Sequence, residues 1–269
     1  MQPRISIIVP CYNGAKYIRE TLDCLRKQTI DDWECVIVND GSTDNSLEIL
    51  KEYAAKDARY KYIDKENGGP AIARNTAIAA SSGKYILPLD ADDLIGASYA
   101  EKAIDYLEEH PNCKLVYCKA EYFGEVKGEW NLPDYSFQSL LYGNMIFCSC
   151  VYRKSDFDRT IGYNPNMKKM HEDWDFLLSL LNEHDTVYCI PETLFFYRQT
   201  SSSRNHTSPE ITQEAYIQLI RNHPDHYTKN LDVVIELSTD ASNYYKHELL
   251  KILNSKSFRL AKFFSKIFR

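Results

Sequence analysis

The chain has 269 residues, of which 44% are hydrophobic and 26% are charged, and its formal net charge is −6. This is the composition of an ordinary globular protein, long enough for one large domain or for one domain with an appendage. An acidic total excludes a general nucleic-acid coat, which needs a basic field, but it allows a local site for an anionic ligand.

The first hundred residues alternate β-branched runs with amphipathic stretches. Strands are predicted at 5–9, 34–38, 60–63 and 85–89, with helices at 18–25, around 47–50 and at 70–81. Asp44 is a plausible N-cap for the second of these helices. Strand, helix and strand repeated in this way predict an α/β fold, with a mostly parallel central sheet flanked by helices.

Polar residues directly follow three of the predicted strands. They are Tyr12-Asn13, Asn39-Asp40 and Asp90-Ala91-Asp92. In parallel sheets, ligands bind outside the carboxyl ends of the strands, near a switch in strand order. The three clusters are therefore expected to converge on one crevice.

The third cluster is unusually acidic. Asp90, Asp92 and Asp93 place three carboxylates within four positions, directly after an apolar run. Such charges repel one another unless something cationic lies among them. The alternative is a solvated turn, because Asp is common in turns.

After residue 110 the pattern is looser. A strand entering a hairpin is predicted at 114–124, further strands at 148–153, 186–190 and 194–198, and a helix at 172–181. The polar run 199–209 is interpreted as a loop or boundary, and the chain from Glu210 onward as wholly helical.

The eight cysteines include no C-x-x-C pair and no neighbouring His cluster, so we expect reduced core thiols rather than a zinc site or disulfides. The N-terminal segment lacks a signal-peptide pattern, and no apolar run approaches the ~20 residues that span a bilayer. We therefore expect a cytoplasmic protein.

Five motifs stand in order along the chain: VPCYNGAKYIRETLDCLRKQT, VNDGSTDNS, NGGPAIARN, LDADD and HEDWDF. With them the chain resembles the family 2 glycosyltransferases of bacteria over roughly residues 3–200. The resemblance implies the nucleotide-sugar-binding GT-A fold and an inverting mechanism. It implies a catalytic domain at 1–205, with a nucleotide-binding half at 1–110 and an acceptor half at 111–205, and a C-terminal helical extension at 206–269.

The resemblance also implies that Asp90-x-Asp92 is the family's D-x-D motif. A diphosphate leaving group cannot rest beside carboxylates without a divalent ion, and hard oxygen ligands suit Mn²⁺ or Mg²⁺. Asp92 is then the chief metal ligand, Asp90 contributes to the metal site and mainly contacts the ribose, and Asp93 supports either.

A nucleotide-sugar pocket is implied at Pro10, Tyr12, Asn13, Asp40, Gly69, Arg74, Asp90 and Ala91. A carboxylate at Asp40 suits a uracil N–H, an aromatic ring at Tyr12 suits stacking on the base, and Arg74 is in reach of the diphosphate or of the D-x-D carboxylates. The alternatives are packing for Tyr12, a simple turn for Asp40 and a surface salt bridge for Arg74.

The motif HEDWDF supplies the implied base. Inverting transfer needs a carboxylate that takes a proton from the acceptor hydroxyl, and Asp173 is expected to be that base. Glu172 is expected to bind the acceptor or to orient Asp173, and Trp174 to line the acceptor pocket. The alternatives are helix capping for the two acids and packing for the tryptophan.

Two later segments are less defined. The run LFFYRQTSSSRN resembles a family segment in which a His stands at the position of Thr200, and it leaves Arg198 and Ser202 as candidates for the diphosphate. As a helix, 256–269 gathers basic residues on one side and apolar residues on the other, which predicts contact with the inner membrane surface. Docking on its own domain, or a homodimer contact, is the alternative.

The leading hypothesis is a metal-dependent transferase that moves a sugar from a UDP-type donor to a hydroxyl of a glycan or lipid-linked glycan in cell-surface polysaccharide synthesis. The alternatives are a non-catalytic nucleotide-sugar binder of the same fold and a D-x-D phosphohydrolase, although that class carries its motif after the first strand. The sequence does not define the sugar, the acceptor or the linkage.

Overall fold

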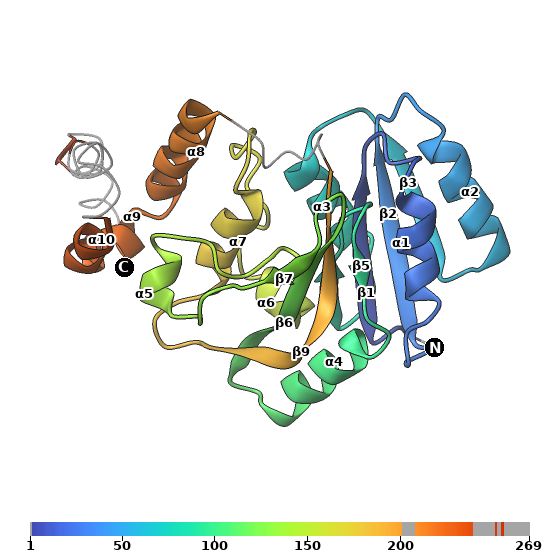
Figure 1. The fold of residues 1–269 in the computed structure, drawn as a ribbon, viewed down its shortest axis with the longest axis horizontal. Helices are drawn as coiled ribbons and strands as arrows, with labels where there is room; N and C mark the ends of the chain where they lie inside the picture. Colours follow the sequence, from blue (N-terminus) through green and yellow to red (C-terminus); the bar gives the residue numbers. More distant parts are fainter. Residues whose placement is uncertain (1, 201–207, 239–250, 252–253, 256–269) are drawn as a thin grey trace.

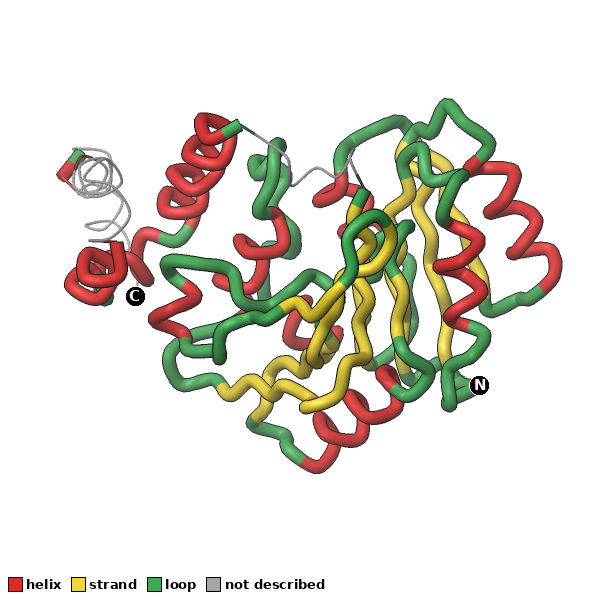
Figure 2. Tube along the Cα trace, viewed as in Figure 1, coloured by secondary structure: helices red, strands yellow, loops and turns green. Residues whose placement is uncertain are grey.

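The structure is a computed structural model that describes residues 2–200, 208–238, 251 and 254–255. One nine-stranded sheet runs through it, with helices on both faces (Figure 1). The strands follow the order β3-β2-β1-β4-β8-β6-β9-β5, and β7 pairs with β6 outside that path. Figure 2 shows these strands as one twisted sheet.

The first half of the sheet is parallel. Its elements are β1 (Ile5–Cys11), α1 (Ile18–Leu25), β2 (Trp33–Asp40), α2 (Ser46–Lys56), β3 (Tyr60–Lys65), α3 (Pro70–Ala79) and β4 (Tyr85–Pro88). The four predicted strands and three predicted helices are all present, and β1 and β2 run further than predicted. Both β1 and β2 are almost completely buried, as expected for parallel strands covered by helices on both faces.

The second half is mixed. Its strands are β5 (Leu94–Ile95), β6 (Cys113–Gly124), β7 (Gly128–Trp130), β8 (Val151–Arg153) and β9 (Thr186–Gln199), and its helices are α4 (Tyr99–Glu109), α5 (Phe137–Leu140), α6 (Lys154–Phe157) and α7 (Glu172–Leu180). The long pair β6–β9 is parallel, whereas β5, β7 and β8 are short strands in antiparallel pairs. The predicted mostly parallel sheet and the predicted hairpin are confirmed.

Two local predictions are wrong. The strands predicted at 186–190 and 194–198 form a single strand, β9, which crosses Pro191 at a register shift in its pairing with β6. A proline is tolerated there because a bulge does not require its missing N–H. The N-cap residue of α2 is Asn45 rather than Asp44, although the Asp44 carboxylate accepts hydrogen bonds from Ser46 N (2.9 Å) and Ala15 N (3.0 Å).

The predicted C-terminal helices are α8 (Pro209–Asn222), α9 (Pro224–Lys229) and α10 (Leu231–Ser238). They pack against the second half of the domain, beside α5 and α7 (Figure 1). In this contact the buried Asp175 of α7 accepts a hydrogen bond from Asn222 Nδ2 (2.6 Å), and His223 Nε2 lies 3.1 Å from the same oxygen.

The predicted membrane-surface segment 256–269 and Ser202 lie outside the described residues. Within the described part, no helix combines the length and the apolar character needed to cross a bilayer. All eight cysteines are free thiols, as predicted.

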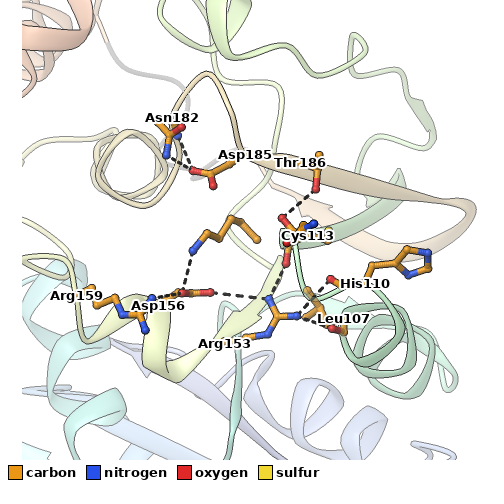
Figure 3. A network of polar contacts seen from close by, with 11 residues as sticks. Leu107, His110, Cys113, Arg153, Asp156, Arg159, Asn182, Asp185 and Thr186 are labelled. Atoms are coloured by element: carbon orange, nitrogen blue, oxygen red, sulfur yellow. Dashed lines mark hydrogen bonds and ion pairs between the residues drawn. The ribbon is translucent and has the colours of Figure 1, made fainter.

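A polar network closes the second half at the end of the sheet where β6 and β9 begin (Figure 3). Arg153 donates to the carbonyl oxygens of Cys113 (2.6 Å) and Leu107, and Asp156 lies 3.9 Å from its guanidinium. Thr186 Oγ1 donates to Asn112 O (3.0 Å). These bonds join α4, β6, β8 and β9 at the end opposite to the carboxyl ends of β6 and β9.

Candidate active site

A cavity of about 690 Å³ lies at the carboxyl ends of β1, β2 and β4. The switch in strand order falls between β1 and β4, where parallel sheets bind ligands. The cavity is lined by almost every residue that the sequence predicts for the site: Pro10, Tyr12, Asn13, Asp40, Gly69, Arg74, Asp90, Ala91, Asp92, Glu172 and Asp173. The three polar clusters therefore converge, as predicted.

We call the side of the cavity formed by the turns after β1, β2 and β4 the first wall. The turn after β1 forms its outer part. Tyr12 is 57% exposed, so the packing alternative does not describe its ring. Asn13 adopts a left-handed backbone conformation (φ 50°), and its Oδ1 accepts a hydrogen bond from Thr43 N (2.8 Å). The turns after β1 and β2 thus hold each other in place, and they leave an aromatic ring open to the cavity.

Asp40, at the end of β2, is buried and strongly hydrogen-bonded. One carboxylate oxygen accepts from Gly68 N (2.9 Å) and Lys65 Nζ (2.7 Å), and the other accepts from Gly69 N (2.8 Å). Gly69 needs a positive φ of 86° to present its amide in this way, which a glycine adopts without strain. Since a carboxylate has about four acceptor positions, Asp40 keeps one for the predicted uracil contact.

Arg74 joins the two halves of the site. Its side chain is only 1% exposed, with Nη2 2.6 Å from Asp90 Oδ1 and Nη1 2.8 Å from Glu172 Oε1. Burial opposes the charge, but these two carboxylates keep the pKa of the guanidinium well above its usual value. The surface salt-bridge alternative is therefore wrong, and Arg74 reaches one of the D-x-D carboxylates, Asp90.

The three acidic residues after β4 have different surroundings. Asp90 and Asp92 are partly exposed on the cavity wall, and Cys148 Sγ lies 3.7 Å from Asp90 Oδ2. Asp93 is fully buried outside the cavity lining, and its Oδ1 accepts a hydrogen bond from the backbone N–H of Arg198 (2.8 Å). Burial, together with the neighbouring acids, raises the pKa of Asp93 well above its usual range. Asp93 therefore attaches β9 to the D-x-D turn rather than facing a ligand.

The chemistry of this wall fits a hard divalent cation. Asp90 and Asp92 offer carboxylate oxygens, which Mn²⁺ and Mg²⁺ prefer. The described residues contain no group of three or more His, Cys, Asp or Glu side chains that could hold a metal by themselves. The chain thus offers part of a coordination shell, and such ions commonly complete their shells with phosphate and water.

Asp173 lies on the same cavity, in the first turn of α7. Its Oδ2 accepts a hydrogen bond from Asn144 Nδ2 at 3.2 Å. Burial and the charge of Glu172 raise the pKa of Asp173 to about 6. A carboxylate with this pKa accepts protons near neutral pH more readily than an ordinary aspartate does. Glu172 itself is buried and paired with Arg74, so it links Arg74 to the residue next to Asp173.

Two candidates lie outside the cavity lining. Trp174 is buried and donates its indole N–H to Leu140 O (2.7 Å), which favours the packing alternative over the predicted acceptor contact. Arg198 is also buried; it pairs with Glu20 (2.8 Å) and donates from Nε to Asp92 O (2.7 Å). It supports the D-x-D turn from behind.

The structure adds lining residues that the sequence did not predict: Trp130, Leu132, Asn144, Ile146, Phe147, Cys148, Phe195, Tyr197 and Thr200. The alternation of Phe195 and Tyr197 on one face of β9 was an available signal. Asn144 had none, because it lies in a turn with no periodic pattern around it.

Comparison with known proteins gives consistent matches. The family model for glycosyl transferase family 2 matches residues 6–174. EpsJ, an uncharacterized glycosyltransferase of Bacillus subtilis (strain 168), is 31% identical over 233 residues, which cover 81% of this chain and 67% of EpsJ. TuaG of the same organism, a putative teichuronic acid biosynthesis glycosyltransferase, is 29% identical over 75% of this chain and 81% of TuaG. With two further curated relatives, the match covers only 30% and 15% of the relative's length.

A solved structure has the same fold. The S. aureus protein TarS, as residues 1–349 in complex with UDP, aligns with a TM-score of 0.66 at 24% sequence identity. The alignment covers 94% of this chain and 72% of that chain. At this identity, the likeness supports the fold alone.

Proposed function

The chain belongs to glycosyl transferase family 2, and from this premise we propose that it is a metal-dependent, inverting transferase that takes a sugar from a UDP-sugar. The proposed acceptor is a hydroxyl of a glycan or lipid-linked glycan in the synthesis of a cell-surface polysaccharide. Both substrates would meet in the cavity at the carboxyl ends of β1, β2 and β4.

One observation carries this proposal. The buried Arg74 pairs with Asp90 of the D-x-D motif through one nitrogen and with Glu172 through the other, so one side chain ties the D-x-D motif to the first turn of α7, which also carries Asp173. A non-catalytic nucleotide-sugar binder would need the D-x-D carboxylates but would not need a further carboxylate, Asp173, on the same cavity. The geometry therefore favours the transferase over the binder.

The residues divide the reaction between them. Asp173 accepts the proton of the acceptor hydroxyl as the oxygen attacks the anomeric carbon of the donor. Asp90 and Asp92 are the ligands for a divalent ion, which, when bound, neutralises the charge that develops on the departing diphosphate. Arg74 holds Asp90 in place and adds a fixed positive charge close to it.

The choice of UDP rests on the first wall of the cavity. The exposed ring of Tyr12 and the remaining acceptor position of Asp40 suit a uracil base and its ring N–H. The TarS structure, which has the same fold, contains UDP, the nucleotide that we propose for this chain. The proposed acceptor class is supported by the printed name of TuaG, which refers to teichuronic acid biosynthesis.

The phosphohydrolase alternative fits the structure less well. The D-x-D motif follows β4, and its neighbour Asp93 is buried and hydrogen-bonded to β9 rather than poised in the cavity. We see no feature of the cavity that favours hydrolysis of a phosphate ester over transfer.

The test is turnover by the purified protein. A panel of UDP-sugars with Mn²⁺ is incubated with extracts of bacterial glycolipid as acceptor, and released UDP is measured. We expect at least one donor to be consumed, and Asp173→Asn to slow its turnover about 10³-fold while UDP affinity, measured by calorimetry, stays within twofold. The exposed Asp134→Asn, outside the cavity lining, is the matched control. UDP binding without any turnover would favour the non-catalytic binder.

A further inference from the structure

The second wall of the cavity is aromatic. It consists of side chains from three separate segments of the second half: Trp130, Leu132, Ile146, Phe147, Phe195 and Tyr197. The metal and the nucleotide, as proposed above, use only the first wall and Arg74. This aromatic surface has no role in that scheme.

The rings are stacked in a fixed arrangement. Phe147 and Phe195 are buried, stack with their centroids 4.2 Å apart, and form the base of the wall. Trp130 lies 5.0 Å from Tyr197 and stacks on Tyr122 at 5.2 Å with an interplanar angle of 21°. Tyr122 does not line the cavity, so it covers one face of the indole and leaves the other side of Trp130 to line the cavity.

The aromatic wall is continuous with the proposed base. Asn144, Ile146 and Phe147 belong to one short segment, and Asn144 donates the hydrogen bond to Asp173. The acceptor hydroxyl has to reach Asp173, whereas the donor is held by its diphosphate at Asp90 and Asp92. A ring beside Asn144 and Phe147 is therefore placed for the acceptor.

The chemistry of the wall suits a sugar ring. One face of a pyranose presents several C–H bonds and no hydroxyl, and such a face packs against the electron-rich face of an indole. Within the part of the chain that the structure describes, the indole N–H of Trp130 has no hydrogen-bond partner. It can donate to a ring hydroxyl, since the indole nitrogen is a donor only.

We propose that Trp130, backed by Tyr122 and flanked by Tyr197, is a stacking subsite for a pyranose ring of the acceptor. The inference rests on the proposed function and adds an acceptor class to it: a sugar with an exposed C–H face next to the hydroxyl that reacts. Trp130 is then a residue that determines acceptor affinity, separate from donor binding and from proton transfer.

Intrinsic fluorescence offers a direct readout. The chain has three tryptophans, and Trp33 and Trp174 are only 2% and 5% exposed. Trp130 is thus the tryptophan that a ligand in the cavity would contact. The protein, with and without UDP and Mn²⁺, is titrated with cellobiose, lactose, maltose and diacetylchitobiose, and with sorbitol as an acyclic polyol that has no ring face. UDP-sugars are titrated separately.

We expect a saturable fluorescence change with at least one disaccharide and none with sorbitol. Binding is then measured by saturation-transfer NMR, which does not depend on the tryptophan. We expect Trp130→Ala to weaken disaccharide binding at least tenfold and Trp130→Phe to retain it, with UDP affinity within twofold in both. Tyr106→Ala removes a stacked ring outside the cavity (3.7 Å from Tyr188) and is expected to retain the response.

Several outcomes would overturn the proposal. It is wrong if no disaccharide responds while UDP binds, or if Trp130→Ala binds sugars as well as the parent protein does. A change produced by UDP-sugars but not by free disaccharides would assign the wall to the donor sugar instead. Absence of UDP binding would contradict the proposed function. The titration without nucleotide would then still test the subsite, because disaccharide binding that Trp130→Ala weakens would support it and no disaccharide binding would contradict it.

Discussion

The two walls of the cavity are built in different ways. The first wall is made of turns that follow parallel strands, and its polar groups are fixed by hydrogen bonds such as those from Gly68 and Gly69 to Asp40. The second wall is made of aromatic rings from a hairpin, a turn segment and the long strand β9. A motif that binds a fixed chemical group can be short, whereas a surface that selects among acceptors is assembled by packing.

Replacing Arg74, which connects the first wall to helix α7, should have the largest effect. Arg74→Met leaves Asp90 and Glu172 without their shared cation, and removal of one partner from a buried pair costs about 3 kcal/mol. We expect the melting temperature to fall by roughly 10 °C and turnover by roughly 10³-fold, since Asp90 and the first turn of α7, which carries Asp173, lose their alignment.

The matched control is Arg19→Met, which removes an exposed pair with Glu52 (2.6 Å). It should leave the melting temperature almost unchanged, because exposed ion pairs contribute little to stability. If Arg74→Met melted like this control and kept its turnover, Arg74 would not be what aligns the first wall with helix α7.

Removing the proposed metal ligand tests the first wall alone. Asp92→Asn should lower turnover by roughly two orders of magnitude, because a catalytic metal contributes several kcal/mol. It should also make UDP affinity independent of Mn²⁺. Chelation of the metal should lower the turnover of the parent protein to a similar extent. Released UDP measures turnover, and calorimetry with and without Mn²⁺ measures UDP affinity. If the UDP affinity of Asp92→Asn depended on Mn²⁺ as it does in the parent protein, Asp92 would not be the metal ligand.

A substitution on the rim of the first wall should separate donor from acceptor. Tyr12→Ala removes the exposed ring, and stacking on a base contributes about 1–3 kcal/mol. We expect UDP affinity to fall about tenfold while disaccharide binding is unchanged, which is the reverse of the pattern for Trp130→Ala. Identical effects of the two variants would contradict the division into two walls.

The pH dependence of turnover tests Asp173, which lies between the two walls and is hydrogen-bonded to Asn144. Burial and Glu172 raise the pKa of Asp173 to about 6, so its protonated form dominates below that pH and cannot accept a proton. Turnover should therefore be full above pH 7 and fall about tenfold by pH 5. Glu172→Gln removes a charge that raises this pKa, and the midpoint of the profile should move to lower pH. A midpoint near 4 in the parent protein would exclude Asp173 as the titrating base.

Much of the first wall was predictable because its geometry follows from strand ends. Tyr12, Asp40 and Asp90 each lie at or just after the carboxyl end of a buried parallel strand, so the fold class alone brings them to one edge of the sheet. Even there, the sequence did not predict the surroundings of each side chain. Asp93 follows the same pattern as Asp90 and Asp92, yet it is buried and hydrogen-bonded to β9.

The second wall was not predictable, and the reason is physical. Trp130 and Asn144 lie in or beside a stretch in which helix and strand periodicity are nearly absent, so their positions depend on packing against distant residues. The continuity of β9 was missed for a similar reason. A proline normally ends a strand, and only the pairing of β9 with β6 on both sides of Pro191 shows that this strand continues.

The contact of Asp175 Oδ1 with Asn222 and His223 ties helix α7 to the C-terminal helices, and this has a consequence for how the two parts evolve. Asp175 stands two residues after the proposed base on α7, and Asn222 holds it from the extension. A chimera that received its last helices from a related protein would leave the buried Asp175 side chain without these partners, unless the new helices brought an amide or an imidazole to the same place. We therefore expect substitutions at Asp175 to be accompanied by substitutions at Asn222 and His223.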